Sequence, residues 1–209
     1  MTDPVSVLDL GDDENRFSLD WLQRVHSFLD GVTGTLVTTG SGKFYSNGLD
    51  LDWLLANGDQ GGKYVAEVQE LFARILTLPV PTVAAVNGHA FGAGAMLAMA
   101  HDFRVMRADR GYFCFPEADI NIPFTPGMAA LIQGKLTPAA AIASMTTGRR
   151  FGGADALALG LVDETAAEPD LLRVASERVG ALAGKDPGTL GAIKSTMFAP
   201  AVTALRTPA

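Results

Sequence analysis

The sequence predicts an α/β domain of largely parallel strands, followed by a helical C-terminal part. Two patterns support this fold class: short apolar segments alternate with amphipathic ones as far as Phe115, and the segments after Pro126 have helical character only. Alternation of this kind indicates parallel strands joined by helical crossovers. The chain has 209 residues, of which 48% are hydrophobic and 19% charged, so we expect it to bury a sizeable core.

The predicted strands are short apolar runs bounded by turn residues. They are expected at residues 5–10, 34–38, 82–86, 103–106 and 112–115. The run TVAAV at 82–86 is apolar throughout, which is typical of a strand that is buried on both faces.

Helices are predicted between these strands from the spacing of the apolar residues. Ser18 is expected to cap the first helix, and the second covers residues 63–78, where Pro79 and Pro81 stop it. The third, residues 93–100, is rich in alanine, methionine and leucine, which are strong helix formers. In the C-terminal part, helices are predicted at 126–133, 138–147, 153–159, 169–182 and 187–198, whereas the final segment APAVTALRTPA is expected to be irregular.

Composition and charge exclude several classes of function. The formal net charge of −7 argues against nucleic acid as the main partner, because phosphate backbones bind basic surfaces. The single cysteine, Cys114, rules out an internal disulfide and a multi-cysteine metal site. No apolar stretch is long enough to span a bilayer, and neither terminus carries a secretory or peroxisomal signal. We therefore expect no membrane partner and a cytoplasmic location.

The segment NGHAFGAGAML, residues 87–97, has the pattern of a strand, a glycine turn and a helix. Unpaired N–H groups and the helix dipole favour negative charge at such a helix N-terminus. A dinucleotide fingerprint would need a third glycine where Leu97 stands. On this motif alone, tight packing of the helix against the strand is the favoured explanation of Gly92 and Gly94.

The segment FPEADINIP, residues 115–123, places Glu117 among apolar residues. A carboxylate in such surroundings is expected to be desolvated, which raises its pKa toward the range needed for proton transfer. A solvated glutamate in a turn is the alternative, and Asp119 is a competing carboxylate.

Two further segments complete a family resemblance: SGKFYSNGLDL at residues 41–51, which is unusually apolar for a loop, and TGRRFGGADALALGLVDE at 147–164. The four segments together resemble the crotonase, or enoyl-CoA hydratase/isomerase, superfamily. Residues 41–51 resemble its first signature, residues 87–105 its second, and FPEADINI the segment with a catalytic glutamate. They follow the family's order and spacing, so the resemblance covers nearly the whole chain.

The resemblance implies a crotonase-like spiral of ββα units with the active site, residues 1–134, and a helical C-terminal region, residues 135–209, that serves oligomerisation. It implies a homotrimer or a dimer of trimers. It also implies an acyl-CoA thioester as substrate, with no permanently bound cofactor and no metal.

The resemblance further implies roles for single residues. The backbone N–H groups of Leu49 and Ala93 would form an oxyanion hole beside the catalytic Glu117. Other roles are also considered for single residues. Asp50 could cap a helix, and Arg16 could be solvated. Lys194 could either contact the CoA or be solvated. Substrate- or CoA-binding roles would fall to Ser46, Gly48, Asp50, Arg16 and Met96.

Two positions indicate the reaction. Hydratases of the family carry two glutamates, of which one matches Glu117 and the other falls on Met96, which cannot activate water. A single base is the pattern of the monofunctional Δ3,Δ2-enoyl-CoA isomerases, in which one carboxylate moves a proton from C2 to C4. The alternatives are an enoyl-CoA hydratase or another crotonase-type reaction, and a non-catalytic acyl-CoA-binding relative, which the short C-terminal part would favour.

Overall fold

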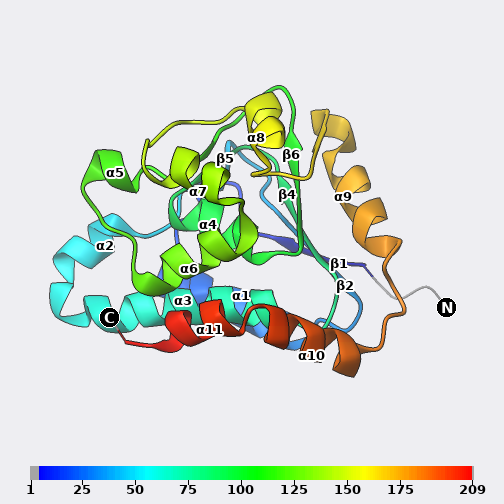
Figure 1. Ribbon diagram of the computed structural model, residues 1–209, viewed down its shortest axis with the longest axis horizontal. Helices are drawn as coiled ribbons and strands as arrows, with labels where there is room; N and C mark the ends of the chain where they lie inside the picture. The colour runs from blue at the N-terminus through cyan, green and yellow to red at the C-terminus, as the bar shows by residue number, and fades with distance from the viewer. Residues whose placement is uncertain (1–4, 209) are drawn as a thin grey trace.

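The structure is a computed structural model that describes residues 5–208, and it contains two parallel sheets (Figure 1). All pairings within the smaller, three-stranded sheet are parallel. The α/β class with parallel strands is therefore confirmed. The larger sheet consists, in spatial order, of β1 (Val5–Asp9), β2 (Thr35–Thr39), β4 (Thr82–Val86), β6 (Phe103–Arg107) and β8 (Glu164–Ala166). The smaller one consists of β3 (Phe44–Ser46), β5 (His89–Phe91) and β7 (Phe113–Cys114).

Helices cover both faces of the larger sheet. Alternate residues of β4 point to opposite sides, so that Val83 and Ala85 pack with α9 (Leu171–Gly180) while Ala84 and Val86 belong to the main core. That main core contains α3 (Gly61–Thr77) and the fully buried α4 (Ala93–Ala100). Figure 1 shows α9 apart from the other helices, on its own side of the sheet. Burial from both sides explains why β4 is apolar throughout.

Local sequence signals fix the helix starts. Ser18 caps α1 (Leu19–Asp30), since its hydroxyl accepts a hydrogen bond from the Trp21 N–H. Asp50 caps the short α2 (Leu51–Ala56) in the same way. A 3-10 turn, η1 (Gly58–Gln60), then leads into α3. The remaining elements of the second half are α5 (Glu117–Ile120), α6 (Pro126–Lys135), α7 (Pro138–Met145), α8 (Gly153–Leu159), η2 (Glu168–Asp170) and α10 (Pro187–Met197).

The prediction that only helices follow Phe115 is wrong, because β8 pairs in parallel with β6 at the edge of the larger sheet. The strand has three residues, Glu164-Thr165-Ala166, and only the last is buried. So short and polar a strand carries no alternation that a sequence pattern could reveal.

The final segment also differs from its prediction as an irregular tail. Residues Ala199–Arg206 form α11, which buries Ala201 and Leu205 against α3 and α6. Pro200 lies in the first turn of this helix, where proline is tolerated because its missing N–H would have had no partner. Figure 1 shows α10 and α11 running side by side with α3, so the C-terminal helices pack on the same core that carries the site.

Candidate active site

A cavity of about 300 Å³ lies where the loop after β3, the N-terminus of α4 and the short helix α5 meet. These three segments are the apolar loop, the glycine turn and the glutamate segment of the sequence. The residues that line the cavity are Arg16, Asn47, Leu49, Leu51, Asp52, Phe91, Gly92, Ala93, Pro116, Glu117, Ile120 and Ile122.

Glu117 is the buried carboxylate of this cavity. It is the first residue of α5 and is only 8% exposed. Its Oε2 atom has no hydrogen-bond partner within residues 5–208. Burial raises the pKa of Glu117 to about 7, because the charged form loses its hydration. Near neutral pH the carboxyl group can therefore both accept and donate a proton.

Gly92 brings the start of α4 against this carboxylate. Its backbone has φ +52° and ψ −122°, a region that residues with a side chain rarely adopt. A Cβ atom at this position would lie 3.4 Å from Oε1 of Glu117. The next residue, Ala93, is the first of α4, and its N–H has no acceptor in the described part of the chain. The N-terminus of a helix presents such N–H groups together with the positive end of its dipole.

The loop after β3 packs directly on this helix N-terminus. A Cβ atom on Gly94 would overlap the carbonyl oxygen of Ser46, and one on Gly48 would lie 2.9 Å from the nitrogen of Ala93. Gly48 has φ +81°, so glycine serves both the turn and the close approach. Directly after this turn, the Leu49 N–H is likewise without an acceptor among the described residues. Two backbone donors without partners in the described chain thus belong to residues of one cavity that also holds Glu117.

Three of the residues singled out in the sequence shape the loop and do not line the cavity. The Ser46 hydroxyl donates to the carbonyl oxygen of Asn15 (2.7 Å) and accepts from the Gly48 N–H (3.0 Å). Asp50 accepts from the Trp53 N–H (3.1 Å), and the Asp50 N–H donates to the hydroxyl oxygen of Tyr64 (2.9 Å). These contacts make Ser46, Gly48 and Asp50 the residues that hold Leu49 in place.

Arg16 lies at the cavity between two carboxylates. Its Nε atom is 2.6 Å from Oε2 of Glu14, and its Nη1 atom is 2.7 Å from Oδ2 of Asp52. The solvated alternative for Arg16 is therefore only partly right, since the side chain is half-buried and ion-paired. Sequence reasoning missed Asp52, whose repeat in Leu-Asp-Leu-Asp is the one signal that could have drawn attention to it.

Met96 and Lys194 lie away from the cavity. Met96 follows Ala93 by one helical turn, but its side chain is 1% exposed and packs within the main core. Lys194 is 4% exposed, and its Nζ atom contacts Oδ2 of Asp102 (2.5 Å) and the carbonyl oxygen of Val80 (2.6 Å). The expectation of a solvated Lys194 side chain is therefore wrong, whereas the expected CoA contact stays a prediction.

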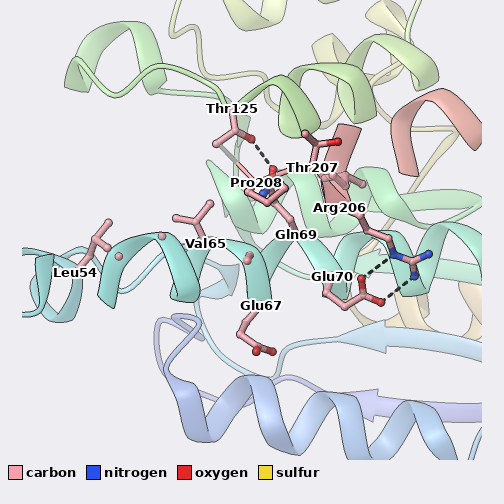
Figure 2. A pocket seen from close by; sticks show the side chains of 13 residues that line it. Leu54, Val65, Glu67, Gln69, Glu70, Thr125, Arg206, Thr207 and Pro208 are labelled. Atoms are coloured by element: carbon pink, nitrogen blue, oxygen red, sulfur yellow. Dashed lines mark hydrogen bonds and ion pairs between the residues drawn. The ribbon is translucent and has the colours of Figure 1, made fainter. Parts of the chain in front are cut away.

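A larger cavity of about 570 Å³ lies between α3 and α11. Figure 2 shows Thr125 donating to the side-chain oxygen of Gln69, and the bidentate ion pair of Arg206 with Glu70. Its two carboxylates, Glu67 and Glu70, are exposed or half-buried. Because no carboxylate that lines this cavity in the described chain is buried, we take the cavity that contains Glu117 as the candidate active site.

None of the helices within residues 5–208 is long and apolar enough to cross a bilayer.

Comparisons with known proteins agree with the fold and with the sequence signatures. A family profile described as enoyl-CoA hydratase/isomerase matches residues 19–208. The chain is 37% identical to enoyl-CoA delta isomerase 2, peroxisomal, of Arabidopsis thaliana, covering 81% of this chain and 77% of that one. It is 38% identical to enoyl-CoA delta isomerase 3 of the same plant, over 75% of this chain and 70% of that one. The crystal structure of a probable enoyl-CoA hydratase from Mycobacterium tuberculosis H37Rv matches 100% of this chain and 90% of that one, with a TM-score of 0.92 and 28% identity.

Proposed function

The chain belongs to the enoyl-CoA hydratase/isomerase family, and from this premise we propose that it is an enoyl-CoA isomerase that moves a double bond from C3 to C2 of an acyl-CoA thioester. One observation carries the proposal: a buried carboxylate, Glu117, shares a cavity with two backbone N–H groups that lack acceptors among residues 5–208. The isomerases of Arabidopsis thaliana among its relatives support the same activity.

The two N–H groups, of Leu49 and Ala93, form the oxyanion hole in this proposal. Removal of a proton from C2 turns the thioester into an enolate, and negative charge develops on the thioester oxygen. Donors already fixed in place stabilise that charge without reorganising, and the loss of one such donor typically costs about 2.7–4 kcal/mol. The Ala93 donor adds the positive end of the α4 dipole.

Glu117 carries the proton between the two carbon atoms. The C2–H bond breaks as the carboxylate takes the proton, the double bond shifts from C3–C4 to C2–C3, and the carboxyl group returns the proton to C4. A pKa of about 7 suits both halves of this transfer, because a group that titrates near the working pH is efficient as base and as acid.

Among the described residues, the cavity holds no second catalytic carboxylate that could activate water for addition. The position that resembles the second glutamate of hydratases is Met96, which is buried in the core. Apart from Glu117, the one carboxylate lining the cavity in the described chain is that of Asp52, which is exposed and paired with Arg16. A hydratase that uses Glu117 alone is the second candidate, because the Mycobacterium tuberculosis protein of similar structure is named as a probable hydratase.

The test is to assay the purified protein on 3-enoyl-CoA for isomerisation and on 2-enoyl-CoA for water addition. We expect isomerisation, with a loss of about 10²–10⁴-fold in Glu117→Gln, and little or no hydration. Hydration faster than isomerisation would favour the hydratase. Binding of acyl-CoA without any turnover would favour the non-catalytic alternative.

We further propose that the chain assembles as a homotrimer or a dimer of trimers, needs no cofactor besides the thioester, and works in the cytoplasm. Large apolar side chains exposed on α7, α8 and α10, namely Ile142, Leu157 and Met197, support burial in an oligomer. Light scattering tests the assembly. Imaging of a tagged chain tests the location, for which two Arabidopsis thaliana relatives named as peroxisomal are the competing precedent.

A further inference from the structure

The mouth of the catalytic cavity holds one cation between two anions. Among the described residues that line the cavity, Arg16 is the one cation, and its guanidinium group is bonded to Glu14 on one side and Asp52 on the other. Arg16 comes from the loop after β1 and Asp52 from α2, so this ion pair connects two walls of the cavity. An anionic ligand entering here meets an arginine that is already neutralised.

The two acidic partners are held very differently. The carboxylate of Glu14 also accepts from the side-chain amide of Asn47 (3.3 Å), and its backbone oxygen accepts from the Asn47 N–H (2.8 Å). Asp52 bonds to no side chain other than Arg16 in the described structure, and its side chain is 86% exposed. It stands on α2, a six-residue helix of which no residue is buried. Asp52 is therefore the partner of Arg16 that a ligand can displace.

We propose that Asp52 is a specificity-determining residue, which competes with a phosphate group of the substrate for Arg16. The inference rests on the proposed function, since it takes the ligand to be a phosphate-bearing acyl thioester. A phosphate offers a guanidinium group two or more charged oxygens in a matching geometry, so it displaces the single exposed carboxylate. A thioester without phosphate leaves the Arg16–Asp52 ion pair in place, and its affinity does not depend on breaking that pair.

The expected size of the effect follows from the exposure of the pair. Exposed ion pairs contribute little to stability, so neutralising Asp52 should tighten binding of a phosphate-bearing ligand by about two- to fivefold. The attraction is screened by salt, so the gain should shrink as ionic strength rises. A ligand without phosphate should bind equally well before and after the change.

The experiment measures the dissociation constants of free coenzyme A and of pantetheine by calorimetry at low salt. Asp52→Asn should bind coenzyme A about two- to fivefold more tightly than the unaltered chain, with no change for pantetheine. Asp52→Glu keeps the charge and should resemble the unaltered chain. Asp59→Asn is the matched control, because Asp59 is an exposed acid of the neighbouring η1 that does not line the cavity, and it should leave both constants unchanged.

A double-mutant cycle with Arg16→Gln shows whether the effect passes through the arginine. Arg16→Gln should weaken coenzyme A binding, and adding Asp52→Asn in that background should bring no further gain. Unchanged coenzyme A binding in Asp52→Asn, an equal gain for pantetheine, or a gain that persists without Arg16 would each overturn the proposal. So would the absence of coenzyme A binding by the unaltered chain. Because these readouts need no turnover, a chain that passes them but fails to isomerise 3-enoyl-CoA loses only the proposed activity.

Discussion

Helix α4 begins and ends in two different environments. At its N-terminus, Ala93 presents an N–H without an acceptor in the described chain, and it lines the same cavity as Glu117, whose Oε2 atom is unpaired among those residues. At its C-terminus, His101 is buried as deeply, but Nδ1 donates to the Leu97 carbonyl oxygen (2.8 Å) and Nε2 lies 3.0 Å from the Thr38 hydroxyl. In the described chain, polar groups at the N-terminal end of α4 lack hydrogen-bond partners, whereas those of His101 at the C-terminal end are paired.

The cations around the C-terminal end complete this pairing. The carbonyl oxygen of His101 accepts a hydrogen bond from Nζ of Lys135 (2.8 Å), which suits the negative end of the helix dipole. Asp102 binds Lys194 and the Thr82 N–H, and Arg104 binds Asp163. Buried polar groups are normally paired, and each exception calls for an explanation. We therefore expect a ligand to supply the missing partners at the N-terminal end of α4.

The largest effect is expected at the paired end. Lys194→Met leaves the carboxylate of Asp102 without its buried cation, which should lower the free energy of unfolding by about 3–5 kcal/mol. Isomerase activity of the folded fraction should not change, because Lys194 lies away from the cavity. Urea unfolding measures the loss, and adding Asp102→Asn should restore part of it. A loss below about 1 kcal/mol would show that this end is not held by its ion pair.

At the N-terminal end of α4, removing the charge of Glu117 should stabilise the fold. The folded-state pKa of Glu117 is about 7, above the 4.5 of a free glutamate, so the native state binds more protons between these values and stability falls as pH rises through that window. The ionised carboxylate then costs on the order of 3 kcal/mol above pH 7.

Glu117→Gln cannot ionise, so it should gain stability relative to the unaltered chain at pH 8 but little at pH 4 to 5. Thermal or urea unfolding of both proteins at the two pH values measures the difference. An equal stability difference at both values would mean that the carboxylate of Glu117 is not desolvated in the fold.

Contact between the loop and α4 can be disturbed without changing any polar group. In Gly94→Ala the new methyl group overlaps the Ser46 carbonyl oxygen, so the loop that carries Leu49 must shift. A displacement of about 1 Å should cost up to about 100-fold in kcat, with a loss of about 1–3 kcal/mol in stability.

Gly134→Ala in α6 is the matched control, since a Cβ atom there meets nothing within 4 Å. It should keep full activity and stabilise the helix slightly. Equal activity in the two variants would mean that the packing of this loop against α4 does not affect catalysis.

The smallest effect is expected for Leu49→Ala. The donor proposed at this position is the backbone N–H, which alanine retains, so kcat should fall by less than about fivefold. Steady-state kinetics on 3-enoyl-CoA gives the value. A loss as large as that of Glu117→Gln would mean that the side chain, and not the backbone, acts at this position.

Much of the fold could be predicted because its signals are local. The Ser18 cap, the prolines after α3 and the apolar run of β4 each specify their element within a few residues. β8 escaped prediction because a three-residue edge strand is defined by its partner β6 and not by its own pattern. The tail forms a helix although it was expected to be irregular, because its proline, Pro200, lies in the first turn, where a helix accepts proline.

For the candidate site, the residue types could be identified but not all of their surroundings. The apolar neighbours of Glu117 indicated that its pKa is raised, and its burial in the structure also raises the pKa. The pairing of Arg16 with Asp52 joins residues 36 positions apart, and that of Lys194 with Asp102 joins residues 92 apart. Such contacts depend on the tertiary fold, so no spacing along the chain could reveal them.

The central claim is that Glu117, desolvated at the open end of α4, is the group that carries the proton. The most direct test is the pH dependence of kcat/KM for 3-enoyl-CoA isomerisation. We expect kcat/KM to rise about tenfold per pH unit in the acid range and to reach a plateau above an apparent pKa near 7. A profile that is flat from pH 5 to 9, or that levels off near the pKa of an ordinary solvated glutamate, would contradict it.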